Sequence, residues 1–157
     1  MEPALPRLPV ELESVLMEVV ETGMRLADGR GVVVRLGAVE PLVVHGDPPT
    51  LRRALVNLVE NAIKYTKAGG TVELSLERDG RDAVVAVSDT GVGMNPADAD
   101  RIFEPFVRLD SARAGESGGA GLGLSIVQSI VAAHDGRLTV RTAPGVGSTF
   151  AIRLPLG

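Results

Sequence analysis

Segments with a helical hydrophobic period alternate along this chain with short segments of β-branched or alternating residues. The helical period predicts helices over residues 10 to about 27, from 48 to a stop at 68–70, and over 122–134, with a short helix at 96–102. Strands are predicted over residues 31–36, 42–45, 71–77, 83–88, 137–142 and 147–154. Helices and strands come in pairs, which favours an α+β fold: a two-layer α/β sandwich with helices on one face of a mixed, mainly antiparallel sheet.

Several element ends carry recognisable signals. Asp47 is a good N-cap for the second long helix, with Pro48 at the first helical position. Residues 1–9 contain three prolines, which predicts a linker or tail followed by one domain over residues 10–157. Residues 109–119 are rich in glycine, serine and alanine, and we expect them to form a mobile loop.

Composition excludes several classes of protein. The chain has no cysteine, so it holds no disulfide framework, zinc–thiolate site or cysteine nucleophile. Its net charge is −4 without any basic run, and aromatic residues make up 3%, which argues against nucleic acid as a partner. No apolar run approaches the length of a membrane span, and the N-terminus lacks the plan of a signal peptide. We therefore expect a cytoplasmic location.

The helix after Asp47 has an unusual polar pattern. Spacings of four and three residues place Asn57, Asn61 and Lys64 in one row on one face. Apolar residues flank that row on both sides, Leu51, Leu55, Leu58 and Ala62 on one and Val56, Val59 and Ile63 on the other. A narrow polar ridge between two apolar flanks indicates the wall of a groove that meets a polar ligand. The alternative is that both asparagines are half-buried structural amides and the lysine is a solvated charge.

Three further segments carry candidate chemistry. The carboxylate of Asp89-Thr90-Gly91-Val92-Gly93 can accept a hydrogen bond from an exocyclic amine, although the segment also suits an ordinary strand-exit turn. Phe103 and Phe106, which can also serve as core aromatics, precede Arg108, whose guanidinium suits a phosphate group. Residues 118–124 place glycines at the start of a helix, where unpaired N–H groups and the dipole favour an anion. Neither a Rossmann fingerprint nor a P-loop fits this last segment.

Together these segments resemble a known domain. Residues 57–65, 89–93, 103–106 and 119–124 look like the N, G1, F and G2 boxes of the ATP-binding catalytic domain of sensor histidine kinases. The order and spacing agree from about residue 12 to residue 154, which is nearly the whole chain. The resemblance implies the Bergerat-type sandwich shared with gyrase, Hsp90 and MutL ATPases, with ATP and Mg²⁺ as cofactors.

The resemblance also implies roles for the polar row and for the arginine. Asn61 resembles the family's magnesium ligand, with Asn57 beside it at the metal and phosphates, and an amide oxygen is a reasonable ligand for this ion. Lys64 would meet phosphate oxygens, and Arg108 would be directed at the γ-phosphate. The expected catalytic residues are Asn57, Lys64 and Arg108, acting by positioning and charge neutralisation.

Other residues would contact the nucleotide. By the same resemblance, Tyr65 would line the pocket and Asp89 would bind the adenine amino group. Gly91 and Gly93 would let the ligand approach the backbone. The glycine-rich segment would allow lid movement and phosphate contact through Gly119, Gly121, Leu122 and Gly123.

The residue at position 57 favours one reaction class. Water-splitting relatives carry a glutamate general base four positions before the metal asparagine, where this chain has Asn57. Because an amide cannot take a proton from water, transfer to an imidazole, which is nucleophilic when neutral, is favoured over hydrolysis. The alternatives are a conformational ATPase of the gyrase or Hsp90 class and a non-catalytic nucleotide-binding module.

A phosphate acceptor is not evident in this chain. One of its two histidines, His45, ends a strand, and the other, His134, ends a helix, where the dipole favours it. Neither lies in the helical context that the family uses for its acceptor. The resemblance therefore implies a separate dimerisation and phosphoacceptor domain in a homodimeric parent protein that can be membrane-anchored. It also implies a response regulator downstream and a monomeric catalytic fragment.

Overall fold

A computed structural model describes residues 7–91, 120–143 and 145–156, apart from the side chains at 120–123 and 143. Within these residues the helices are α1 (Leu12–Ala27), α2 (Pro48–Lys64) and α4 (Ala120–Ala133). The strands are β1 (Leu8–Glu11), β2 (Val33–Val39), β3 (Val43–Gly46), β4 (Thr71–Asp79), β5 (Asp82–Asp89), β6 (Arg137–Ala143) and β7 (Gly147–Pro155). In the described part, no helix is long and apolar enough to span a bilayer. The helix predicted at 96–102 and the loop predicted at 109–119 lie outside it.

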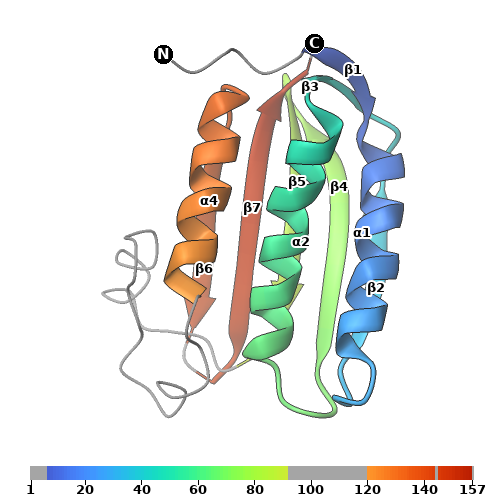
Figure 1. The fold of residues 1–157 in the computed structure, drawn as a ribbon, viewed down its shortest axis with the longest axis vertical. Coiled ribbons are helices and arrows are strands. Elements are labelled where there is room, and N and C mark those ends of the chain that lie inside the picture. Colours follow the sequence, from blue (N-terminus) through green and yellow to red (C-terminus); the bar gives the residue numbers. More distant parts are fainter. Residues whose placement is uncertain (1–6, 92–119, 144, 157) are drawn as a thin grey trace.

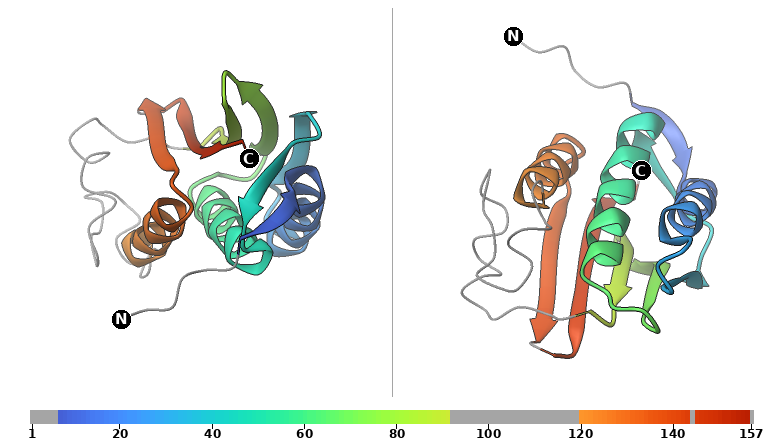
Figure 2. Two further views of the ribbon diagram at one scale, coloured as in Figure 1. Left: turned by 90° about the horizontal axis from the view of Figure 1, so that it is seen from above. Right: turned by 60° about the horizontal axis from the view of Figure 1, so that its bottom comes forward.

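Five strands form the main sheet, in the order β2-β4-β5-β7-β6. β2 pairs with β4 in parallel, and the remaining neighbours pair antiparallel. The helices α1, α2 and α4 lie side by side against one face of this sheet (Figure 1, Figure 2). β1 and β3 form a separate two-stranded antiparallel ribbon. The predicted mixed, mainly antiparallel sheet with helices on one face is therefore confirmed.

α2 is the central helix because both of its apolar flanks are buried. Leu58 on one flank and Val59 on the other are at most 1% exposed, and α1 and α4 pack on its two sides. The helix begins as predicted, with Pro48 in its first turn and the Asp47 carboxylate accepting a hydrogen bond from the backbone N–H of Thr50 at 3.3 Å. The helix that carries the predicted polar row is thus held rigidly in the middle of the layer.

The N-terminal boundary differs from the prediction. Leu8 and Pro9 were expected in a tail, but they belong to β1, which pairs with β3 from Leu8 opposite Gly46 to Glu11 opposite Val43. Val10 was expected in the first helix, yet it is a strand residue and 3% exposed. A proline is tolerated in β1 because this strand pairs on one side only. The three prolines favoured a linker in the prediction, although the last of them lies in a short strand.

The end of α2 also differs from the prediction. The helix ends at Lys64, before the expected stop at 68–70, and Tyr65 is its C-cap. The hydroxyl of Thr66 donates to the carbonyl of Ala62 at 2.7 Å and so satisfies one of the last helical carbonyls. After the helix, the backbone N–H of Gly69 donates a 2.7 Å hydrogen bond to the carbonyl of Gly31, shortly before β2. A side-chain hydrogen bond, not the glycine pair, ends the helix.

Candidate nucleotide-binding site

The end of α2, the end of β5 and the start of α4, which carry most of the described site residues that were predicted, lie at one end of the molecule. α2 finishes and α4 begins at the lower end of the view in Figure 1. The exit of β5 reaches the same end, because a Cβ atom at Gly91 would lie 2.4 Å from the Tyr65 carbonyl oxygen. The segment that holds Asp89 is therefore in contact with the end of the helix that carries Asn61.

Asp89 is oriented toward the helices. It is the last residue of β5 and continues the alternation of Val85 and Val87, which face the helices and are at most 1% exposed. Its Oδ1 accepts hydrogen bonds from the backbone N–H groups of Gly91 at 2.8 Å and Ser148 at 3.3 Å. No described residue donates a hydrogen bond to Oδ2. Among the described residues, the donors to this carboxylate therefore all lie on Oδ1.

Burial raises the pKa of the Asp89 carboxyl above its usual value. The backbone N–H groups of Gly91 and Ser148 act in the opposite sense, because they stabilise the ionised form. A carboxylate that is partly desolvated and held by two fixed donors is typical of a binding site rather than of an exposed turn.

Asn61 is more deeply buried than a ridge residue would be. Its side chain is 7% exposed, and its Nδ2 donates to the backbone carbonyl of Asn57 one turn earlier, at 3.0 Å. Within the described residues the amide oxygen of Asn61 receives no hydrogen bond. Half of this amide is therefore structural, as the alternative interpretation held, and the other half is a buried polar atom that lacks a partner in this part of the chain.

The remaining members of the row have different environments. Asn57 is half-buried, and Lys64 is exposed in the last turn of α2. Tyr65 is half-buried as the C-cap, and its backbone N–H donates to the carbonyl of Asn61 at 3.2 Å. The amide end of the row is thus fixed in the protein, and the ammonium end lies in solvent.

Gly91 has a structural role that the sequence did not reveal. Any side chain there would meet the Tyr65 carbonyl at 2.4 Å and the Asp89 carboxylate at 2.8 Å. The neighbouring Thr90 is fixed by two bonds to Thr71, one donated from its backbone N–H at 3.1 Å and one accepted by its hydroxyl at 2.9 Å. The glycine therefore permits close packing of the protein on itself, whether or not it also admits a ligand.

Several predicted site residues lie partly or wholly outside the described structure. Gly93, Arg108 and Gly119 are outside the described residues, as are the aromatics Phe103 and Phe106. Three others fall in the first turn of α4, which begins at residue 120, two residues earlier than predicted. These are Gly121, Leu122 and Gly123.

The sequence did not predict that the β6–β7 hairpin contacts Asp89. Gly147 has φ +140°, and a Cβ atom there would lie 2.1 Å from the backbone oxygen of Asp89. The adjacent Ser148 is the residue whose N–H binds the Asp89 carboxylate. The available signal was Gly147, which was predicted only as the first residue of the strand over residues 147–154.

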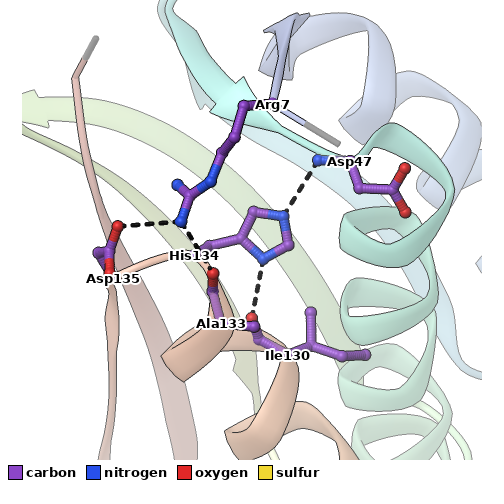
Figure 3. A network of polar contacts seen from close by, with 6 residues as sticks. All are labelled: Arg7, Asp47, Ile130, Ala133, His134 and Asp135. Atoms are coloured by element: carbon purple, nitrogen blue, oxygen red, sulfur yellow. Dashed lines mark hydrogen bonds and ion pairs between the residues drawn. The ribbon is translucent and has the colours of Figure 1, made fainter. Parts of the chain in front are cut away.

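The two histidines occupy the opposite end of the molecule. His45 is exposed on β3, whereas His134 is 3% exposed just after α4. Nε2 of His134 accepts from the backbone N–H of Asp47 at 3.1 Å, so Nδ1 carries the proton that is donated to the carbonyl of Ile130 at 2.8 Å (Figure 3). Hydrogen bonding of a neutral ring explains this position better than the helix dipole that the sequence suggested.

Arg7 completes this network (Figure 3). Its guanidinium donates to the carbonyl of Ala133 at 3.2 Å and to the carboxylate of Asp135 at 3.1 Å. The beginning of α2, the end of α4 and the residue before β1 are thus connected far from the predicted nucleotide contacts. Because both nitrogens of His134 are used, this ring is poorly placed to accept a phosphoryl group.

Comparison with known proteins gives a consistent result. The family described as histidine kinase-, DNA gyrase B-, and HSP90-like ATPase matches residues 46–157. The chain is 42% identical over 153 residues to the sensor-like histidine kinase SenX3 of Mycobacterium tuberculosis, covering 95% of this chain and 37% of that protein. It is 38% identical over 142 residues to the phosphate regulon sensor protein PhoR of Pseudomonas aeruginosa, covering 90% of this chain and 32% of that protein. The chain therefore spans about a third of these relatives.

Solved structures of sensor histidine kinases are also similar to this chain. The mycobacterial sensor histidine kinase MprB superposes with a TM-score of 0.80 at 31% identity, over 96% of this chain and 97% of that chain. Full-length ShkA in complex with AMPPNP gives a TM-score of 0.86 at 34% identity, over 100% of this chain and 32% of that chain. Fold and sequence thus point to the same family. The chain belongs to the histidine kinase-, DNA gyrase B- and HSP90-like ATPase family, as an ATP-binding catalytic domain of the sensor histidine kinase type.

Proposed function

We propose that this domain binds Mg-ATP and donates the γ-phosphoryl group to a histidine on a separate dimerisation and phosphoacceptor domain. The observation that carries the proposal is the junction of β5 with the end of α2. There Asp89 has described donors on Oδ1 alone, and Gly91 lies against Tyr65 at the end of the helix that bears Asn61. Relatives named as sensor histidine kinases, and the AMPPNP complex of ShkA, support the same chemistry.

The adenine ring would be recognised by Asp89. An ionised carboxylate accepts hydrogen bonds only, so Oδ2 selects a ligand group that donates, such as the exocyclic amine of adenine. A base with a carbonyl at that position would bring two acceptors together. Gly91 and Tyr65, which contact each other at the end of α2, would form one border of the base pocket.

Asn61 fits a magnesium ligand. Its oxygen is buried and receives no hydrogen bond from the described residues, and a neutral amide oxygen is an accepted ligand of hard cations. Among the described residues no group of three or more His, Cys, Asp or Glu side chains could hold a metal, so phosphate oxygens, water and the adjacent Asn57 would complete the shell. Mg²⁺ bound there would neutralise charge on the phosphates.

The cationic side chains would act on the phosphates. Lys64 is exposed in the last turn of α2, one helical turn beyond Asn61, and would reach phosphate oxygens along the same face. Arg108 would be directed at the γ-phosphate, with Gly93 and Gly119 as flanking glycines. Because Asn57 cannot serve as a general base, the site favours an imidazole nucleophile over water.

The partners of the parent protein are part of the same proposal. The chain spans about a third of its curated relatives, so the acceptor domain, the homodimeric assembly and the response regulator would be supplied by other parts of the system. We propose a cytoplasmic location for the domain, in a parent protein that can be anchored in a membrane.

Titration with ADP and ATP, with and without Mg²⁺, tests the binding step. Wild-type protein should bind both nucleotides, and Asn61→Ala should lose the dependence on Mg²⁺. Transfer is tested with γ-labelled ATP and a separately expressed acceptor domain, using an acceptor in which the histidine is replaced by alanine as the control. Steady multi-turnover hydrolysis without an acceptor would favour the conformational ATPase, and nucleotide binding with no transfer would favour the non-catalytic module.

A further inference from the structure

The β6–β7 hairpin is packed directly against the carboxylate that the proposed function assigns to the base. Asp89 and Ser148 are opposite residues in the β5–β7 pairing. Gly147 approaches the Asp89 backbone so closely that no side chain fits between them. Ser148 is 8% exposed, and its N–H is one of the two donors to Asp89 Oδ1. The position of this turn therefore decides whether the second donor is in place.

Thr142 on β6 fixes that turn. Its hydroxyl lies 2.9 Å from the hydroxyl of Ser148 and donates to the carbonyl of Gly147 at 3.4 Å. Thr142 and Ser148 are also opposite residues in the β6–β7 pairing. A single hydroxyl thus contacts the carbonyl of the Gly147–Ser148 peptide unit, which presents the N–H to Asp89, and the side chain of Ser148.

These residues also share one hollow at the surface. It has a volume of about 290 Å³, and its lining includes Asp89, Thr142, Gly147 and Ser148. Thr142 and Asp89 therefore border the same open space, which Arg141 also lines.

We propose that Thr142 is a positioning residue that sets the base selectivity of the site by holding the Ser148 N–H against Asp89 Oδ1. With two donors on Oδ1, only Oδ2 remains for the ligand, and both donors stabilise the ionised, accepting form of the carboxylate. The inference rests on the proposed function and extends it from the carboxylate to a residue on another strand.

The chemical consequence concerns the group at position 6 of a purine. An ionised carboxylate accepts from a 6-amino group and repels a 6-oxo group, whereas a protonated carboxyl can donate to the 6-oxo group. Burial already raises the pKa of Asp89 toward the protonated form, and the Ser148 N–H opposes that shift. Loss of the Thr142 hydroxyl would weaken this opposition, so that 6-oxo nucleotides gain relative to 6-amino nucleotides, most of all in mild acid.

The test compares the affinities of ATP and inosine triphosphate, which differ at this position. Thr142→Val keeps the β-branched shape and removes the hydroxyl, and it should lower the ratio of ATP to inosine triphosphate affinity by about five- to tenfold. Thr142→Ser should restore the ratio. Ser148→Ala, which removes the partner hydroxyl, should lower the ratio as well, and combining it with Thr142→Val should add little.

Thr139→Val is the matched control, because Thr139 is exposed on the same strand, three residues before Thr142 and opposite Ala151. Its ratio should equal that of wild type at neutral and mildly acidic pH. An unchanged ratio in both Thr142→Val and Ser148→Ala, or an equal weakening of the two nucleotides, would overturn the inference. Absence of nucleotide binding by wild-type protein would instead overturn the proposed function, so the two failures are distinguishable.

Discussion

At the scale of single residues, Asp89 combines features that favour binding and oppose stability. Its carboxyl is partly desolvated, and burial raises its pKa in the folded state. A group whose pKa is raised by folding contributes stability below its unfolded pKa, and that contribution is lost as the pH rises through the folded value. At neutral pH the ionised Asp89 therefore costs the free protein some stability.

Asp89→Asn should consequently raise the free energy of unfolding at neutral pH while weakening the binding of ATP. The amide oxygen can still accept from Gly91 and Ser148, so the backbone contacts survive, but its NH₂ group cannot accept from an adenine amine. Urea unfolding at neutral and acidic pH checks the first part, and the gain should disappear in acid. Asp28→Asn, at an exposed carboxylate after α1, is the control and should change neither quantity. A variant that is less stable than wild type at neutral pH would contradict this account.

The candidate site was only partly predictable from individual residues. Asn61 and Asp89 could be named because helical spacing and strand-exit position are local properties of the sequence. The hydrogen bond from Ser148 to Asp89 could not be predicted, because the two residues are 59 positions apart and the bond depends on the register of β5 with β7. The two-fold role of Asn61, half structural and half available, likewise depends on how its amide is turned within the helix.

At the scale of elements, local patterns predicted the presence of helices and strands better than their ends. The strand predicted over residues 71–77 is part of β4, and Val72, Leu74 and Leu76 in it are each 0% exposed. The end of α2 was not, because a threonine hydroxyl satisfies the last turn before the glycines are reached. β1 was missed because a short strand with a proline has almost no signal of its own and is defined by its partner β3.

The junction of α2 and α4 at His134 allows a second prediction. His134→Ala would leave the N–H of Asp47 and the carbonyl of Ile130 without their bonds and open a cavity in a site that is 3% exposed. We expect a loss of about 2–4 kcal/mol in the free energy of unfolding. The control is His45→Ala, at the exposed histidine of β3, which should stay within about 0.5 kcal/mol of wild type.

Urea denaturation of His134→Ala and His45→Ala measures the change in the free energy of unfolding for each variant. If both lose the same amount of stability, the hydrogen bonds of His134 do not hold the helices together. His134→Gln offers a further check, because a carboxamide has one donor and one acceptor side and should recover part of the loss.

At the scale of the whole molecule, the two ends of the helix layer carry different polar groups. The end with β1, β3, the start of α2 and the finish of α4 carries the His134 and Arg7 network (Figure 3). The other end carries Asp89, the finish of α2 and the turn before β7. The layer order itself was predictable, since one apolar face per helix and alternating strands permit few other arrangements. The parallel pairing of β2 with β4 was not, because it joins segments that are not neighbours along the chain.

This division predicts that stability and nucleotide affinity can be changed separately. Val10→Ala, in the β1–β3 ribbon, removes a side chain that is 3% exposed and should lower the free energy of unfolding by about 2 kcal/mol. The increment in stability that a fixed excess of ADP confers depends only on its affinity for the folded state. That increment should therefore be the same in Val10→Ala as in wild type.

Chemical denaturation with and without ADP measures both quantities in one experiment. Leu8→Ala, in the same strand but 54% exposed, is the control and should change neither. Asp89→Asn should show the reverse behaviour, with a smaller ADP increment and no loss of stability. A reduced increment in Val10→Ala would mean that the ribbon and the carboxylate end are coupled through α2. In that case the helix would transmit changes between the ends and could not be treated as a rigid support.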